Sequence, residues 1–190
     1  MTHIERMRLV RDEFRLREAT DDKFQTKRWA TVEEAELLYT LTCDNNIQRV
    51  VEIGTANGWT AAWFALAGAT VYTFDVSPRP KMYLDSAFPF PDLVEFIKFQ
   101  LIPSPACIQT LPHYSAPTLW FIDADHTYTP AKADFDAVRA VARPRDFIVQ
   151  HDATGERGSA RVWAETVALN LGPSKLYTTR NGIGVVRVGH

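Results

Sequence analysis

Two short segments combine acidic and histidine side chains directly after apolar runs. Asp123 and His126 follow one such run, and His151 and Asp152 follow the next. Oxygen ligands with one imidazole could hold Mg²⁺ or Mn²⁺ through Asp123, His151 and Asp152. Alternatively, His126 or His151 acts as a general base and the acids only orient the imidazole. The residue types leave both interpretations open.

A glycine-containing segment after an earlier apolar run indicates a nucleotide-like ligand. Gly54 and Gly58 have no Cβ atoms to keep a ligand away from the backbone, and a helix expected after them points free N–H groups at that ligand. Asp75 lies at the end of the next apolar run, 21 positions beyond Gly54. A carboxylate there can accept hydrogen bonds from both hydroxyls of a ribose. Together these residues favour an adenosine-type ligand over simple packing of a helix on a strand.

The elements that must position these residues alternate between strand and helix. Short apolar or β-branched runs predict the strands, and small-residue or amphipathic segments predict the helices. The expected strands are 49–53, 70–74, 96–99, 118–122, 146–150, 175–179 and 183–188, the last two forming a hairpin. The expected helices are 4–14, 31–45, 60–67, 130–142 and 160–169. Thr31 and Glu34 have capping-box spacing at the start of the second helix.

This alternation predicts an α/β fold, a Rossmann-like doubly wound sheet that is mostly parallel. The closing hairpin places one antiparallel strand at the edge of the sheet. Ligands of such sheets bind outside the carboxyl ends of the strands, where the glycine segment and both acidic segments fall. The 190 residues fit one domain over 31–190, and residues 1–30 form a helical lid in which Trp29 closes the site.

Composition bears on the partners and on the compartment. The formal net charge is −2 and no basic stripe is present, which argues against nucleic acid as a partner. No apolar run approaches the about 18 residues of a membrane span, and the N-terminus does not look like a signal peptide. Cys43 and Cys107 lie outside any metal-ligand spacing, so we expect two reduced thiols in a cytoplasmic protein.

Three segments together resemble the class I methyltransferases that use S-adenosylmethionine (SAM). They are Glu-Ile-Gly-Thr-Ala-Asn-Gly at 52–58, the acid at 75, and Phe-Ile-Asp-Ala-Asp-His at 121–126. The resemblance extends from about residue 31 to the C-terminus and is closest to small-molecule O-methyltransferases of the catechol, caffeoyl-CoA and natural-product types. It implies a seven-stranded sheet whose last strand is antiparallel, SAM as cofactor and a small-molecule hydroxyl as methyl acceptor. Size and fold would suit a homodimer.

Position by position, the resemblance also implies the cofactor contacts. The residues that would bind SAM are Glu52, Gly54, Thr55, Ala56, Gly58, Asp75, Val76, Ser104 and Asp123. Within this set Asp75 would hold the ribose, and Val76 and Ser104 would lie near the adenine.

The catalytic centre follows from the same resemblance. His126 stands where catechol-type enzymes place a catalytic lysine, so His126 would take the hydroxyl proton beside Asp123. Asp123, His151 and Asp152 match the metal-binding positions. Because the last pair begins with histidine instead of an acid, a metal-independent reaction stays open beside a metal-assisted one.

Two other functions compete with methyl transfer. Tyr128 and Lys132 have the Tyr-x-x-x-Lys spacing of short-chain dehydrogenases, which would suit a nicotinamide-dependent oxidoreductase. The glycine segment lacks Gly-x-Gly-x-x-Gly spacing, however, and Pro130 interrupts that pair. A non-catalytic protein with the same fold is the third interpretation.

Overall fold

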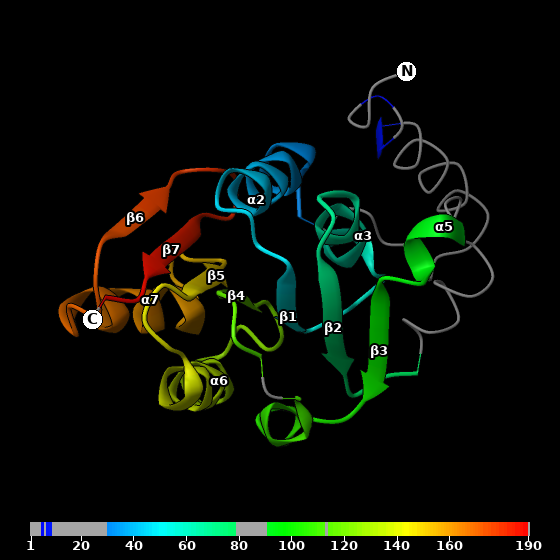
Figure 1. Cartoon of the computed structure of the whole chain (residues 1–190). Helices are drawn as coiled ribbons and strands as arrows, with labels where there is room; N and C mark the ends of the chain where they lie inside the picture. The colour runs from blue at the N-terminus through cyan, green and yellow to red at the C-terminus, as the bar shows by residue number, and fades with distance from the viewer. Residues whose placement is uncertain (1–4, 6, 9–29, 79–90, 113, 190) are drawn as a thin grey trace.

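A seven-stranded sheet forms the centre of the computed structural model, which describes residues 5, 7–8, 30–78, 91–112 and 114–189. The strand order is β3-β2-β1-β4-β5-β7-β6 (Figure 1). The strands are β1 (Arg49–Ile53), β2 (Thr70–Asp75), β3 (Ile97–Leu101), β4 (Thr118–Ile122), β5 (Phe147–His151), β6 (Ser174–Tyr177) and β7 (Ile183–Arg187). The described helices are α2 (Val32–Asp44), α3 (Trp59–Leu66), α5 (Pro91–Val94), η2 (Ala106–Thr110), α6 (Tyr128–Val141) and α7 (Gly158–Ala168).

The predicted doubly wound sheet is confirmed, with one correction to its edge. Strands β1 to β5 pair in parallel, and β7 is antiparallel to both of its neighbours, β5 and β6. The antiparallel strand therefore lies second from the edge, because β7 inserts between β5 and β6. The strand order progresses outward in opposite directions from β1 and β4, which makes their carboxyl ends the expected ligand site.

Helices cover both faces of the sheet, with α2 and α3 on one side and α6 and α7 on the other (Figure 1). All five residues of β1 are buried, as expected for a central parallel strand. Val50 packs in the cluster that contains Phe64 of α3, whereas Val51 packs in the cluster that contains Phe135 of α6. This alternation fixes the register of β1 and so the position of the residues that follow it.

The start of α2 confirms the predicted capping box. The Glu34 backbone N–H donates to the Thr31 hydroxyl (3.2 Å), and the Thr31 N–H donates to the Glu34 carboxylate (2.7 Å). The predicted lid, residues 1–30 with Trp29, lies almost entirely outside the described residues and stays a prediction. Within the described ranges, no helix is long and apolar enough to cross a membrane.

Candidate active site

A cavity of about 500 Å³ opens at the carboxyl ends of β1, β2 and β4. Its lining contains six of the residues predicted to bind the cofactor: Gly54, Ala56, Asp75, Val76, Ser104 and Asp123. The other lining residues are Ile53, Phe74, Ile102, Ala124, Asp125, Pro130 and Asp134. The predicted ligand edge of the sheet is thus hollow, and strand-end residues form its wall.

The loop between β1 and α3 is held by the carboxylate of Asp75. Its Oδ2 accepts the N–H groups of Thr55 (3.1 Å) and Ala56 (3.0 Å), and its Oδ1 accepts the N–H of Ser77 (2.8 Å). Gly54 has a φ of +98°, and a Cβ there would lie 2.3 Å from the Asp123 carbonyl oxygen. The close approach of the backbone that follows β4 therefore requires a glycine here, whether or not a ligand binds.

Glu52 does not line this cavity, contrary to the predicted contact with the cofactor. Its side chain is fully buried beneath the loop, where the hydroxyls of Thr60 and Thr73 donate to its two carboxylate oxygens. Burial raises the pKa of Glu52 to about 8, and the negative charges of Asp123 and Asp75 act in the same direction. Through these two hydroxyls Glu52 thus connects β1 to the start of α3 and to β2.

Two other predicted cofactor residues also lie outside the main cavity. Thr55 lines a small adjoining hollow that it shares with Trp59 and Asp123, and its hydroxyl pairs with that of Thr73 (2.6 Å). Gly58 is the N-cap of α3 and adopts a φ of +77°. Both residues shape the loop, and neither forms the wall of the 500 Å³ cavity.

The cavity wall also contains an acid that sequence reasoning missed. Asp134 lies on α6, is 4% exposed and accepts a hydrogen bond from the Ser104 hydroxyl. Burial raises the pKa of Asp134. Its sequence signal was available, because Asp134 stands on the same helix face as buried Ala131, Phe135 and Val138. An acid on the apolar face of an amphipathic helix is a candidate for a site.

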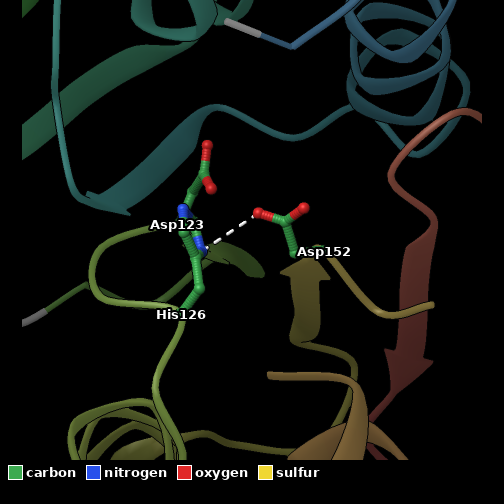
Figure 2. Close-up of side chains that lie close together, drawn as sticks. All are labelled: Asp123, His126 and Asp152. Atoms are coloured by element: carbon green, nitrogen blue, oxygen red, sulfur yellow. Dashed lines mark ion pairs between the residues drawn. The ribbon is translucent and has the colours of Figure 1, made fainter. Parts of the chain in front are cut away.

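A histidine–carboxylate pair lies beside the cavity, on the loops after β4 and β5 (Figure 2). His126 Nδ1 lies 3.0 Å from Asp152 Oδ2, and the Arg157 guanidinium lies 2.5 Å from Asp152 Oδ1. Burial opposes ionisation of Asp152, but His151, His126 and Arg157 outweigh it and lower its pKa. The carboxylate is therefore charged and is oriented toward His126.

The first turn of α7 holds both loops in place. The Ser159 N–H donates to the His126 carbonyl oxygen (3.2 Å), and the Ser159 hydroxyl donates to the Asp152 carbonyl oxygen (2.9 Å). At Gly158 a Cβ would lie 2.1 Å from the backbone nitrogen of Tyr128, so only glycine allows α7 to begin this close to α6. One helix start thus fixes the distance between the two predicted catalytic segments.

His151 is buried between carboxylates. Its Nδ1 lies 3.0 Å from Asp123 and 3.4 Å from Asp152, and its Nε2 lies 3.3 Å from Glu34. Burial alone would lower the pKa of His151, but the three acids outweigh it and raise the pKa well above 6.5. His151 is therefore an internal cation, and its partner Glu34 was not predicted as part of the site.

The fit of a divalent ion depends on Asp123, His126 and Asp152, whose ligand atoms lie within 4.8 Å of one another (Figure 2). The predicted set had His151 in place of His126, but both ring nitrogens of His151 already lie beside carboxylates, those of Asp123 and Asp152 at Nδ1 and that of Glu34 at Nε2. Each carboxylate also has a cation already, since His151 neighbours Asp123 and Arg157 contacts Asp152. A divalent ion here would have to compete with these two cations for both carboxylates, which argues against a metal at this site.

The dehydrogenase-like pair lies away from the cavity. The Tyr128 hydroxyl donates to Glu165 (3.1 Å), and Lys132 contacts Asp136 (2.5 Å). Neither Tyr128 nor Lys132 lines the cavity. The structure therefore does not place the Tyr-x-x-x-Lys pair of the oxidoreductase interpretation at the cavity.

Several solved structures share this fold at low sequence identity. An O-methyltransferase from Bacillus cereus in complex with S-adenosylhomocysteine (SAH) is 18% identical, with 94% of this chain and 90% of that chain covered and a TM-score of 0.72. TomG from Streptomyces achromogenes, an O-methyltransferase of tomaymycin synthesis in complex with SAM, is 17% identical, with coverages of 85% and 82% and a TM-score of 0.68. An SAH-bound methyltransferase from Podospora anserina is 13% identical, with coverages of 100% and 89% and a TM-score of 0.75.

Sequence comparison gives the family. No curated protein matches the chain. A family model described as a methyltransferase domain matches residues 51–153, which is more than half of the chain and includes the glycine loop, Asp75, Asp123 and Asp152. The methyltransferase resemblance seen in the sequence is thereby confirmed, and the chain belongs to this methyltransferase domain family.

Proposed function

We propose that this protein transfers a methyl group from SAM to a hydroxyl of a small molecule and that it does so without a divalent metal. One observation carries the proposal: a 500 Å³ cavity with four aspartates in its wall adjoins a histidine oriented by a carboxylate. The cavity suits the cofactor and the histidine suits the proton transfer. The O-methyltransferases that share the fold support the choice of acceptor.

The charge of the cavity favours a cationic ligand. Asp75 and Asp125 line it together with Asp123, which also has His151 beside it, and Asp134, whose pKa is raised by burial. SAM combines a sulfonium and an ammonium with a single carboxylate, so its net positive charge is attracted to these acids. A neutral adenosine or a nicotinamide dinucleotide, which has two phosphates, would not gain this attraction.

The cavity wall also offers contacts for an adenosine group. Asp75 presents a carboxylate for the ribose hydroxyls, as predicted from its position after β2. Val76 beside it is 74% exposed, and such an apolar side chain at a cavity is suited to cover a flat base. Ser104 with Asp134 adds polar atoms for the edge of the adenine.

His126 is the proposed general base. Asp152 favours the tautomer in which Nδ1–H donates to the carboxylate, which leaves Nε2 with a lone pair for the proton of the acceptor hydroxyl. When bound, SAM supplies an electrophilic methyl group that passes to the acceptor oxygen and leaves SAH. The proton stays on His126 until it passes to solvent, which His126 can reach because its side chain is 40% exposed.

Asp123 is the residue that connects the two halves of the site. It lines the main cavity, the hollow beside Thr55 and a small hollow that includes His126 and His151. A carboxylate held by His151 at this junction can orient the acceptor hydroxyl between the cofactor and His126. Catalysis here then rests on alignment and one proton transfer.

Further aspects of the proposal concern surroundings and partners. Cys43 and Cys107 are both free thiols, which supports a reducing, cytoplasmic compartment. The net charge of −2 supports a small-molecule acceptor over nucleic acid, and no membrane partner is proposed. Size and fold alone support a homodimer.

Calorimetric titration of chelator-treated protein with SAM, then with Mn²⁺, tests the proposal. We expect SAM to bind, Asp75→Asn to weaken it at least tenfold, and the exposed Asp92→Asn to leave it unchanged. Absence of SAM binding would overturn the cofactor assignment. Mn²⁺ binding that Asp152→Asn abolishes would overturn the metal-independent part.

Turnover distinguishes an enzyme from a non-catalytic protein of the same fold. With catechol as a probe acceptor, His126→Gln should lower SAH release about 10²-fold or more, with the affinity for SAM retained. SAM binding without SAH release from catechol or a wider panel of hydroxyl compounds would favour the non-catalytic interpretation.

A further inference from the structure

A second cavity, of about 280 Å³, lies at the opposite end of the central strands. Arg49 and Thr118, the first residues of β1 and β4, both line it. Gly54 and Asp123, which follow the last residues of the same strands, line the 500 Å³ cavity, the proposed cofactor cavity. The two cavities share no lining residue. The second cavity is therefore separate from the proposed active site.

Arg49 is a buried charge without an ion-pair partner in the described part of the chain. Its side chain is 4% exposed, its Nη1 donates to the Pro112 carbonyl oxygen (3.0 Å), and its Nε has no hydrogen-bond partner. The guanidinium lies 5.2 Å from the ring of Tyr114 and 5.9 Å from that of Trp120. Aromatic faces attract a cation but do not neutralise it, so the charge of Arg49 is only partly compensated.

The rest of the wall adds positive charge more than negative. Burial of Arg49 lowers its pKa, and the charge of Arg143, which also lines the cavity, adds to this, whereas Tyr72, Asp146 and Tyr114 act in the opposite direction. Among the described residues Asp146 is the one lining carboxylate, and it accepts from the N–H groups of Thr118 (2.8 Å) and Arg143 (3.0 Å) and from the Trp120 indole (3.0 Å). Two guanidinium groups, of which that of Arg143 is exposed, against one carboxylate leave the lining with an excess of positive charge that an anion would offset.

The remaining lining is mostly apolar and includes an indole, with Thr118 and the Tyr114 hydroxyl as its polar groups. Ile108, Leu111, Val141 and the ring of Trp120 form this part of the wall. An inorganic anion would leave these side chains without contacts. An anion carried on a flat apolar ring would use both the charge and the apolar wall.

We propose that this cavity is a second ligand site, which binds a small aromatic carboxylate with its carboxylate toward Arg49 and Arg143 and its ring on the apolar wall. The site is independent of the proposed methyl transfer. It places a ligand against the first residues of β1 and β4, the same two strands whose ends form the cofactor cavity.

Fluorine NMR with 4-fluorobenzoate as the probe tests this site, with and without saturating SAH to occupy the cofactor cavity. We expect a Kd of about 1 mM or tighter in both conditions, within the affinity that a ligand of this size can reach. Arg49→Met and Arg143→Ala should each raise the Kd at least tenfold. Arg143→Ala should also keep the unfolding midpoint of the wild type, which shows that its weaker binding is not caused by unfolding. Arg139→Ala, an exposed arginine on α6 outside the cavity, is the matched control and should leave the Kd unchanged.

Two comparison ligands define the chemistry. Inorganic phosphate should fail to displace 4-fluorobenzoate at equal concentration, because it lacks the ring, and neutral 4-fluorobenzyl alcohol should bind at least tenfold more weakly, because it lacks the charge. The proposal would be overturned if 4-fluorobenzoate does not bind, or if Arg49→Met and Arg143→Ala bind it as tightly as the wild type does. Displacement by phosphate would reduce the site to a general anion site and would overturn the ring assignment.

Discussion

Glu34 and Glu52 are both fully buried at the carboxyl edge of the sheet, yet their ionisation differs. Burial raises the pKa of Glu52 to about 8, because its close donors are only two hydroxyls. Burial also opposes ionisation of Glu34, but hydrogen bonds from His151 and from the backbone N–H groups of Thr31 and Asn181 hold its pKa well below the usual range. Neutral hydroxyls therefore leave a buried carboxyl protonated, whereas a cation and backbone N–H groups keep it charged.

The two glutamates consequently have different structural roles. Glu34 joins three distant parts of the chain, since it also accepts the Thr179 hydroxyl (2.9 Å) and the Asn181 N–H (2.8 Å) from the segment between β6 and β7. Through His151 it reaches Asp123 in the candidate active site. Glu52 contacts only the elements around its own loop. Replacing the acid with a neutral amide should therefore lower the stability of the fold strongly at Glu34 and hardly at Glu52.

The largest expected effect is that of Glu34→Gln. The amide cannot accept from every one of the donors around it, and His151 loses the counter-charge on its Nε2 side. Breaking a buried ion pair from one side costs about 3–5 kcal/mol of unfolding free energy. Urea denaturation at neutral pH measures the loss. Glu36→Gln, a half-exposed acid on the same helix, is the control and should change stability by about 0.5 kcal/mol or less. A loss as small as the control's would mean that Glu34 and His151 are not a charged pair.

Glu52→Gln should show its effect in the pH dependence. The folded pKa is about 8 and the ordinary value is 4.5. As pH rises from 4.5 to about 8, unfolded Glu52 loses its proton before folded Glu52 does, so the wild type loses stability over this window. The glutamine variant has no such loss, and its stability relative to the wild type should rise by at most about 1.4 kcal/mol for each pH unit.

Urea denaturation at several pH values across that window measures this rise. Exposed Glu95→Gln is the control and should give the same difference from the wild type at every pH. A constant difference for Glu52→Gln as well would show that Glu52 is ionised in the folded protein at neutral pH, as Glu34 is.

The positions of the strand ends were predictable from the sequence, because they depend on local pattern. The apolar runs before Gly54, Asp75 and Asp123 placed these residues at one edge of a parallel sheet, and all three line the cavity. The Thr31 and Glu34 spacing predicted the capping box in the same way. Each inference used residues close together in the chain and one rule about where parallel strands end.

The pairs that set charge were not predictable, because they join distant segments. His151 and Glu34 are 117 positions apart, and no local pattern indicates that they meet. For that reason the sequence suggested a metal ligand at His151, whereas in the structure both ring nitrogens of His151 already face carboxylates. The contact predicted for Glu52 failed for a related reason: the motif shows an acid near the end of the strand, but only the packed structure shows that its side chain is buried away from the cavity.

Thr73→Val is the smallest of the three changes and tests how far the Thr73 hydroxyl lowers the pKa of Glu52. The variant removes one hydroxyl donor from Glu52 and the partner of the Thr55 hydroxyl, so it should cost about 1 kcal/mol at neutral pH. Because hydrogen bonds from hydroxyls lower the pKa of Glu52, their partial loss should raise it above 8. The fall in stability with pH should then continue to a higher pH than in the wild type. Urea denaturation against pH measures that upper limit, with Thr70→Val on the same strand as the control. An unchanged limit would mean that the Thr73 hydroxyl does not stabilise the charged form of Glu52, so that the donors around Glu34 would account for the difference between the two glutamates.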